Sequence, residues 1–311
     1  MRILLTGATG FIGQELAKKL ESNELHCIER YVTGRYGFDA KNAIIHHVNL
    51  TDYNRVRAIV KEIQPDIVMH LAAISAVSYS YDNPIEVSEV NYIGSINLAE
   101  ACRTEAHNLT QFIAAGTSEE YGMSLTSAKE KLSEDSPLMP NSPYACAKVA
   151  FDNYLRYMGL AYSFPYTIMR PFNTYGRKNN RHFFIERTIS EMLSNPRGTI
   201  YLGDPDAVRD WLYVDDHVQA YLSTLGNKAA LGQAFNFGTG KGYTTRDTAE
   251  LIAELAHFSG HIVWNSTPRR PLDARVLIGD SSKAGKLLNW KPKYTLTQGL
   301  QKTVAHWRSL L

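Results

Sequence analysis

Short apolar runs alternate with amphipathic stretches through the first half of the chain. Compact apolar runs of about four to eight residues predict buried strands, and apolar residues that recur about every three or four positions predict helices. By this pattern, strands are expected at 2–6, 25–28, 43–48, 66–71 and 111–115, and helices at 14–20, 52–61, 87–103 and 143–159. Strands that alternate with helices form a parallel sheet covered on both faces. The pattern therefore predicts the α/β class, with a doubly wound parallel sheet.

A glycine-rich turn follows the first predicted strand. It reads Gly7-Ala8-Thr9-Gly10-Phe11-Ile12-Gly13 and leads directly into a predicted helix. Glycines let the backbone approach a pyrophosphate, and the free N–H groups at a helix N-terminus attract its negative charge. A strand, a glycine turn and a helix in this order predict a dinucleotide-binding site in a Rossmann sheet, with Gly7, Gly10, Phe11, Ile12 and Gly13 against the cofactor.

Two charged residues, Glu29 and Arg30, follow the second predicted strand. An acidic residue there hydrogen-bonds the ribose 2′-hydroxyl of NAD, whereas an arginine pairs with the 2′-phosphate of NADP. Adjacent residues of a strand project in opposite directions, so only one of the two faces the adenosine. We favour Arg30 and NADP, with NAD as the alternative.

Tyr144 and Lys148 stand one turn apart in the predicted helix that follows Ser142 and Pro143. Ser142 suits an N-cap and Pro143 suits the first helical position. The spacing places the phenol and the ammonium group on one helix face. An ammonium beside a phenol favours the phenolate and lowers its pKa. The pair therefore predicts a general acid and base that works near neutral pH.

Polar residues follow the fifth predicted strand, where Thr117, Ser118 and Glu119 come after Gly116. The active site of a doubly wound sheet lies at the carboxyl ends of its strands. We therefore expect a hydroxyl here to hydrogen-bond a substrate oxygen beside Tyr144. The Glu119 carboxylate is placed to take a proton from carbon.

The composition favours a soluble protein of a reducing compartment. Lys and Arg total 33 against 31 Asp and Glu, interspersed along the chain, with a formal net charge of +2. Without a basic block, nucleic acid is not an expected partner. No apolar run reaches membrane-spanning length, and Gly7 interrupts any signal-peptide core. The three cysteines have neither disulfide nor metal-ligand spacing, so we expect a cytoplasmic protein without a metal site.

Four motifs, in chain order, resemble those of the extended short-chain dehydrogenase/reductases that act on nucleotide sugars. They are T-G-A-T-G-F-I-G at 6–13, H-L-A-A at 70–73, T-S-E-E-Y-G at 117–122 and S-P-Y-A-C-A-K at 142–148. Further matches extend the resemblance over essentially the whole chain: R-P-F-N-T-Y-G at 170–176, V-R-D-W-L-Y-V-D-D at 208–216, R-P-L-D at 270–273 and L-I-G-D at 277–280. The motifs at 117–119 and 277–280 look most like those of GDP-mannose 4,6-dehydratases.

The resemblance implies a role for each matching residue. Thr117, Tyr144 and Lys148 would form the catalytic set, with Glu119 as a further acid and base. A nucleotide-diphosphate sugar would be the substrate, and its expected ligands are Ser118, Asn173 and Arg209, with Arg270 and Arg275 as weaker candidates for the diphosphate. Further cofactor contacts are expected from Asn49, Leu50, Leu71, Ala72 and Ala73.

The resemblance also implies two lobes and self-association. We expect residues 1–172 to form the dinucleotide-binding domain, with a return segment at about 207–238. Residues 173–206 and 239–311 would form a smaller lobe that binds the nucleotide sugar. In the family the two long helices beside the active site pair with a second subunit, which implies a homodimer or a higher homo-oligomer.

Three chemistries compete within this family. A 4,6-dehydratase needs a carboxylate after the fifth strand, and Glu119 provides one, so dehydration of GDP-mannose is our first expectation. The glycine turn departs from the Gly-Gln-Asp-Gly ending of GDP-mannose dehydratases, and the chain is short for that group. A GDP-4-keto-6-deoxymannose reductase and a 4-epimerase therefore stay open as alternatives. The run at 209–214 is more typical of dehydratases and epimerases than of reductases.

Overall fold

A seven-stranded parallel sheet forms the larger part of the molecule, with strand order β10–β6–β5–β4–β1–β2–β3. The computed structural model describes residues 1–30, 40, 42–125, 127, 129–177, 180–267 and 271–310. The strands are β1 (Arg2–Thr6), β2 (Glu24–Glu29), β3 (Ile44–His47), β4 (Ile67–His70), β5 (Gln111–Ala115), β6 (Tyr166–Pro171) and β10 (Gln233–Phe237). The order reverses between β1 and β4, which confirms the predicted doubly wound sheet.

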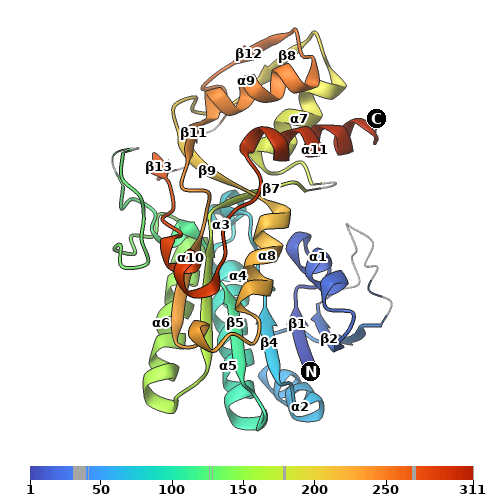
Figure 1. The fold of residues 1–311 in the computed structure, drawn as a ribbon, viewed down its shortest axis with the longest axis vertical. Helices are drawn as coiled ribbons and strands as arrows, with labels where there is room; N and C mark the ends of the chain where they lie inside the picture. Colours follow the sequence, from blue (N-terminus) through green and yellow to red (C-terminus); the bar gives the residue numbers. More distant parts are fainter. Residues whose placement is uncertain are drawn as a thin grey trace.

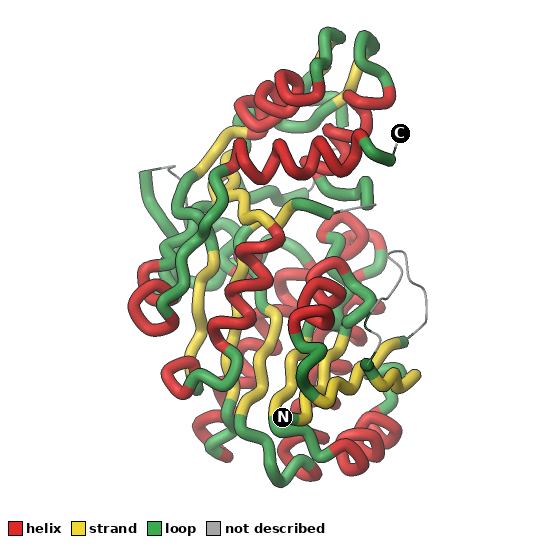
Figure 2. Tube along the Cα trace, turned by 45° about the vertical axis from the view of Figure 1, so that its right-hand side comes forward, coloured by secondary structure: helices red, strands yellow, loops and turns green. Residues whose placement is uncertain are grey.

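Helices cover both faces of this sheet (Figures 1 and 2). One face carries α1 (Phe11–Lys19), α8 (Val214–Thr224) and α10 (Ser282–Leu288), and the other carries α2 (Tyr53–Ile63), α5 (Gly94–Glu105) and α6 (Pro143–Tyr162). The side chains of β1 alternate between the two layers: Ile3 and Leu5 pack toward α1, and Leu4 packs toward α2. Each such side chain, when fully buried, contributes about 1.5–3 kcal/mol. Both faces of β1 are therefore apolar, as in a sheet buried on both sides.

A smaller lobe lies above the sheet in Figure 1 and contains the C-terminus. Its strands are β7 (Asn173–Tyr175), β9 (Val208–Tyr213), β11 (Gly242–Thr244) and β13 (Val276–Leu277) in one sheet, and β8 (Thr199–Tyr201) with β12 (His261–Val263) in another. Its helices α7 (Phe184–Ser194), α9 (Thr245–Ala256) and α11 (Leu296–Arg308) enclose a separate apolar core. Strands of two or three residues carry too little periodicity to be predicted from a sequence.

The helix expected at 87–103 is interrupted. The segment consists of α4 (Pro84–Ser88), the π-helical turn η1 (Glu89–Ile93) and then α5. The wide turn contains Asn91, which is fully buried and exchanges two hydrogen bonds of 2.8 and 2.9 Å with the backbone of Ile74. π-turns inside helices frequently occur at functional sites, and this one fixes the loop after β4. The remaining short helices are α3 (Val77–Asp82), η2 (Ser118–Glu120) and η3 (Lys228–Ala230).

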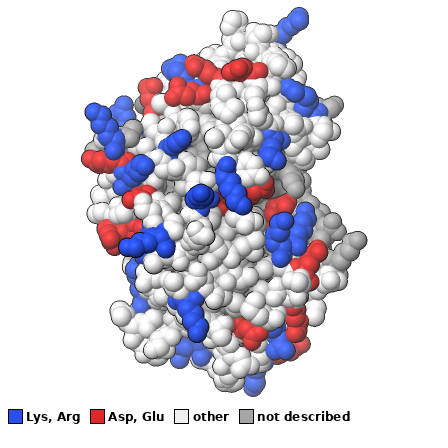
Figure 3. All heavy atoms as spheres, viewed as in Figure 1, with Lys and Arg blue, Asp and Glu red and all other residues white. Residues whose placement is uncertain are grey.

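The charged side chains show no concentration of one sign on the face drawn in Figure 3, where Lys and Arg lie among Asp and Glu. Across the described ranges, no helix combines the length and the apolar character needed to cross a membrane. The same part of the chain contains no group of three or more His, Cys, Asp or Glu side chains that could hold a metal ion.

Candidate active site

A cavity of about 990 Å³ lies at the carboxyl ends of the large sheet's strands and continues into the small lobe. The glycine turn after β1 lies along one part of its wall, and the N-terminal part of α6 lies along another. Arg209 of β9 and Asn173 of β7 bring the small lobe into the same wall. The cavity thus joins residues that lie far apart in the sequence, at the sheet edge where the sequence predicted a site.

The glycine turn has no room for side chains. Gly7 has a φ of +74°, and a Cβ there would lie 2.8 Å from the Ala72 nitrogen. A Cβ on Gly13 would lie 2.0 Å from the Gly7 carbonyl oxygen. The N-cap of α1, Gly10, makes no side-chain capping hydrogen bond, and residues 10–13 of this first turn line the cavity. The N–H groups of a first helical turn lack partners within the helix. This cradle fits the pyrophosphate of a dinucleotide.

Glu29 and Arg30 point in different directions, as the strand geometry predicts. The Glu29 carboxylate accepts hydrogen bonds from the Thr9 N–H at 3.1 Å and the Thr9 hydroxyl at 2.8 Å. Burial raises the pKa of Glu29, and the bonds from Thr9 oppose that rise. Arg30 is about half exposed, and its guanidinium lies 3.8 Å from a carboxylate oxygen of Glu86. Glu29 therefore lies against the glycine turn, whereas Arg30 turns toward α4.

Helix α6 begins as the sequence predicts and presents Tyr144 and Lys148 to the cavity. The Ser142 hydroxyl oxygen accepts the Ala145 N–H at 3.1 Å, and Pro143 occupies the first turn. The Thr117 side chain is close enough to the Tyr144 phenol to lower its pKa. The Lys148 ammonium donates to the Ala115 carbonyl oxygen at 2.7 Å, at the end of β5. Strand β5 and helix α6 thus hold these three side chains together.

The predicted lowering of the phenol's pKa is wrong for this structure. Burial raises the pKa of Tyr144 above its usual value, the Thr117 hydrogen bond lowers it, and the charges of Glu119 and Glu120 raise it further. Burial also lowers the pKa of Lys148 to about 8, against a raising effect of Glu120. Desolvation outweighs the helix spacing, because the ammonium is directed at the Ala115 carbonyl oxygen rather than at the phenol.

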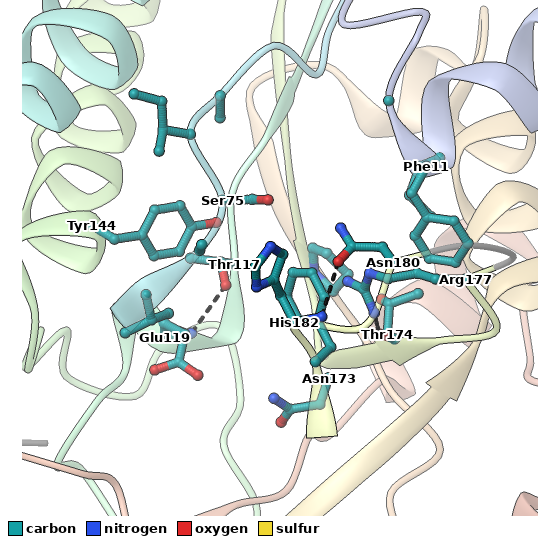
Figure 4. A pocket seen from close by; sticks show the side chains of 18 of the residues that line it. Phe11, Ser75, Thr117, Glu119, Tyr144, Asn173, Thr174, Arg177, Asn180 and His182 are labelled. Carbon is teal, nitrogen blue, oxygen red and sulfur yellow. Dashed lines mark hydrogen bonds between the residues drawn. The ribbon is translucent and has the colours of Figure 1, made fainter. Parts of the chain in front are cut away.

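Thr117, Ser118 and Glu119 form a tight turn at the same edge. The Thr117 hydroxyl oxygen accepts the Glu119 N–H at 3.2 Å and thereby starts η2. Figure 4 shows Glu119 and Thr117 on the side of the cavity that carries Tyr144. Glu119 is buried and lines the cavity, and its charge raises the pKa of Tyr144. A hydroxyl, a phenol and a carboxylate therefore meet where the sequence expected them.

Three buried polar atoms of residues in the cavity wall have no hydrogen-bond partner within the described residues. They are the Asn173 Oδ1, the Glu186 Oε2 and the His217 Nε2. The other ring nitrogen of His217 lies 2.9 Å from the Thr174 hydroxyl. Buried polar groups without a partner are costly, which suits a wall that receives a polar ligand. The sequence analysis did not select His217, although it lies in the first turn of the helix after β9.

The other expected substrate ligands differ in position. Arg209 is buried in the cavity wall and donates to an Asp273 carboxylate oxygen at 3.0 Å. Ser118 also lines the cavity. Arg275 is exposed and is not part of the described cavity wall, so the structure does not bring it to the site. Arg270 lies outside the described residues.

All expected cofactor residues line the cavity: Gly7, Gly10, Phe11, Ile12, Gly13, Arg30, Asn49, Leu50, Leu71, Ala72, Ala73, Tyr144 and Lys148. The wall opposite Tyr144 contains residues that the sequence analysis missed, among them Arg177, Asn180 and His182 (Figure 4). The Arg177 guanidinium lies 4.7 Å from the ring centroid of Phe11 and 3.5 Å from that of Phe183. The basic residues at 177–182, directly after the Asn-Thr-Tyr-Gly motif, could have indicated from the sequence that this segment lines the cavity.

The fold and this site define a Rossmann-type extended short-chain dehydrogenase/reductase. A family model described as GDP-mannose 4,6 dehydratase matches residues 4–303. The chain therefore belongs to this family, whose members include nucleotide-sugar dehydratases, epimerases and reductases. The resemblance inferred from the motifs is thus confirmed.

Curated relatives cover almost the whole chain and represent three activities. A UDP-glucose 4-epimerase of Mycolicibacterium smegmatis is 32% identical over 99% of both chains. The dTDP-glucose 4,6-dehydratase 1 of Escherichia coli is 28% identical over 99% of this chain and 93% of its own. A GDP-6-deoxy-D-mannose reductase of Pseudomonas aeruginosa is 26% identical over 99% and 97%. These relatives support the family without distinguishing its activities.

Solved structures agree with the fold. A UDP-glucose 4-epimerase from Thermotoga maritima, crystallised with UDP-glucose, has a TM-score of 0.91 at 30% identity and covers 100% of this chain and 99% of its own. The UDP-glucose 4-epimerase of Thermus thermophilus in complex with NAD has a TM-score of 0.90 at 31% identity, with 100% of both chains covered. Both relatives share the Rossmann architecture derived above.

Proposed function

We propose that this chain is an NAD(P)-dependent nucleotide-sugar 4,6-dehydratase, with GDP-mannose as the first-choice substrate. The observation that carries the proposal is Glu119, a buried carboxylate in the cavity wall beside Tyr144 and Thr117. Loss of water from C6 requires a base for the proton on C5, in addition to the acid and base that act on the 4-oxygen. The site has a separate group for each task.

The side chains divide the chemistry as follows. Tyr144 takes the proton of the 4-hydroxyl, and Thr117 orients that oxygen by a hydrogen bond. Glu119 removes the C5 proton and passes it to the C6 hydroxyl, which then leaves as water. A proton that Tyr144 took from the 4-hydroxyl, and that exchanges with solvent, finally replaces the one lost from C5. Lys148, on the same face of α6, supplies the positive charge that favours the Tyr144 phenolate against the effect of burial. A bound nicotinamide would supply the hydride acceptor for C4 and the hydride donor for C6, so the reaction would consume no cofactor overall.

The contacts at the end of β2 favour NAD over the NADP preferred from the sequence. The Glu29 carboxylate lies against the glycine turn, where it suits a ribose hydroxyl and would repel a 2′-phosphate. Arg30 is half exposed and lies near Glu86 instead. NAD is therefore part of the proposal, and NADP is the alternative.

The small lobe supplies the substrate ligands in this proposal. Residues 173–206 and 239–311 bind the nucleotide sugar together with β9, which pairs with β7, β11 and β13 of the small lobe although the predicted return segment of about 207–238 included it in the cofactor domain. Residues 1–172 and the rest of that return segment bind the cofactor. Arg209 suits the diphosphate, because its guanidinium is permanently charged and presents a fork of donors. The Asn173 amide, whose oxygen has no partner among the described residues, suits a sugar hydroxyl.

A homodimer is a further part of the proposal. The outward side of α6 presents Tyr157 and Leu160, and Leu160 is 91% exposed. Ile93, on the neighbouring η1 turn, is exposed as well, and η1 packs against α6. Exposed apolar side chains on both of these neighbouring helical segments suit helix-to-helix pairing with a second copy.

Product analysis tests the proposed activity against its two rivals. The protein is incubated with NAD and either GDP-mannose, dTDP-glucose or UDP-glucose, and the sugar nucleotide is followed by mass spectrometry and by absorbance at about 340 nm. A dehydratase yields a product that is lighter by one water, with no net change in absorbance. An epimerase leaves the mass unchanged. A reductase leaves these three substrates unchanged and is detected in a parallel reaction with NADPH and a nucleotide-linked 4-keto-6-deoxy sugar, where the absorbance at about 340 nm falls. Epimer formation without loss of water, or that fall in absorbance without dehydration, would replace the proposal.

A further inference from the structure

Glu120 is a buried acid directly beneath the catalytic turn, and the mechanism above does not use it. It follows Glu119 in the sequence but points away from the cavity and is 0% exposed. Buried carboxylates are rare unless they are paired, so the position of this one requires a reason.

Both oxygens of Glu120 have defined partners. Oε1 accepts the Thr117 N–H at 2.8 Å, which closes a capping box around η2. Oε2 accepts Nε of Arg170 at 2.8 Å. A Cβ on Gly116 would lie 2.6 Å from Oε1, so the glycine provides the space that the carboxylate needs. Glu120 is thus built into the backbone that carries Thr117.

Charged groups of two other elements face Glu120. Arg170 comes from β6, and Asp152 and Lys148 come from α6, while Tyr121 follows on its own turn. Arg170 donates to Asp152 at 2.5 Å and to the Tyr121 hydroxyl at 2.9 Å. Arg156, near the surface, donates to the other oxygen of Asp152. The carboxylates of Glu120 and Asp152 and the cations of Arg170 and Lys148 form this buried set. Their charges sum to zero only while Glu120 is ionised.

The same charge acts on the two catalytic side chains. Glu120 raises the pKa of Lys148 against the lowering caused by burial, and it raises the pKa of Tyr144 in the same direction as burial. A carboxylate within a buried site exerts a stronger field than one in water. Loss of its charge would therefore shift both titrations toward lower pH.

We propose that Glu120 is a positioning residue for the catalytic set, whose buried carboxylate, held between the Thr117 N–H and the Arg170 guanidinium, fixes the Thr117 backbone and places a negative charge beneath the catalytic turn. The inference rests on the acid and base role of Tyr144 and Lys148 in the proposed function. It does not depend on which nucleotide sugar is the substrate.

Glu120→Gln removes the charge while the amide oxygen can still accept the Thr117 N–H. The amide nitrogen cannot accept from Arg170 Nε, so the variant also loses that hydrogen bond. The readout is the ¹³Cε resonance of Lys148 in lysine-labelled protein without substrate, assigned by its absence in Lys148→Met. We expect the titration midpoint of Lys148 to fall by about one pH unit or more in Glu120→Gln. Both limbs of the kcat/KM profile should move to lower pH in the same variant. An unchanged Lys148 midpoint would overturn the proposal.

Glu134→Gln is the matched control. Glu134 is a partly buried acid that accepts the Asn236 N–H at 2.8 Å on the far side of the same network, and it does not contribute to the charge state of Lys148 or Tyr144. In Glu134→Gln, the titration midpoint of Lys148 should equal that of the wild type. A shift as large as that of Glu120→Gln would mean a general loss of structure rather than a specific charge, and would count against the proposal.

Glu120→Asp separates the two parts of the role and serves if the Gln variant does not fold. The shorter side chain keeps the charge but does not span the same distance to Thr117. In Glu120→Asp, the titration midpoint of Lys148 should stay near the wild-type value while kcat falls and KM changes little.

In the wild type itself, the Lys148 resonance should report the ionisation of Glu120 as a coupled step. Absence of that step would contradict the proposal. If the protein turned over no nucleotide sugar but Glu120→Gln still shifted the Lys148 midpoint, the proposed function would be rejected. The electrostatic coupling between Glu120 and Lys148 would nevertheless stand.

Discussion

Replacement of Tyr144 by phenylalanine separates chemistry from folding, because it removes one oxygen and leaves the ring in place. Tyr144 is 7% exposed, so the phenylalanine ring fills the same space and creates no cavity. The Thr117 side chain interacts with the hydroxyl, and loss of an interaction of hydrogen-bond strength costs about 0.5–1.5 kcal/mol of stability. For a chain of this size, that cost lowers Tm by only a few degrees.

The effect on turnover should be much larger. Loss of a positioned acid and base costs about 10²- to 10⁴-fold in rate. That range equals about 3–5 kcal/mol of barrier height, which the folding cost cannot supply. We therefore expect kcat to fall by at least about 10²-fold while the affinity for NAD, measured by fluorescence titration, changes by less than about threefold.

Tyr166→Phe is the matched control for this variant. Tyr166 is also 7% exposed, but it lies at the beginning of β6, at the opposite end of the sheet from the cavity. The same atom is removed at the same burial, so Tm should change to a similar extent while kcat stays within about twofold of the wild type. If Tyr144→Phe turned over substrate as fast as Tyr166→Phe, Tyr144 would not be the acid and base.

Three further predictions concern the cofactor, the glycine turn and the oligomer. Glu29→Gln should weaken NAD and improve NADP binding in titrations, whereas Arg30→Ala should change both affinities equally; a selective loss of NADP in Arg30→Ala would restore the NADP assignment. Gly13→Ala places a Cβ 2.0 Å from the Gly7 carbonyl oxygen, so NAD affinity should be lost and stability should fall by about 1–3 kcal/mol. Gly285→Ala, whose nearest neighbour would lie at 3.5 Å, should bind NAD normally. Leu160→Glu should convert a dimer to a folded monomer in analytical ultracentrifugation, and an unchanged sedimentation coefficient would locate any interface elsewhere.

Local sequence signals predicted the dinucleotide-binding half of the fold well. The apolar run of β1, the glycines after it and the capped start at Ser142 act over a few residues, so their consequences can be read without the tertiary structure. The π-helical turn at Asn91 could not be predicted in this way. It depends on a hydrogen-bonding partner, Ile74, that lies 17 positions earlier in the chain.

The sequence predicted which residues line the site, but it did not predict the directions of their charged groups or their pKa shifts. Helix spacing correctly placed Tyr144 and Lys148 on one face, yet the direction of the Lys148 ammonium depends on Ala115, 33 positions away. Glu119 and Glu120 are adjacent and chemically identical in the sequence, and only the fold sends one toward the cavity and the other toward Arg170. His217 was missed because its partner, Thr174, belongs to another strand.

The most direct test of the dehydratase assignment is exchange of the C5 hydrogen in deuterated water. Wild type, Glu119→Gln and Glu250→Gln are each incubated with NAD and GDP-mannose; Glu250 is an exposed acid on α9 and serves as the control. Gln keeps the shape and the hydrogen bonding of Glu119 but cannot act as a base. The wild type and the control should form a 4-keto-6-deoxy sugar that carries deuterium. Glu119→Gln should form a 4-keto sugar that keeps its 6-oxygen and its C5 hydrogen. A 4-keto-6-deoxy product from Glu119→Gln at the wild-type rate would contradict the account and make Glu119 an ordinary carboxylate of the cavity wall.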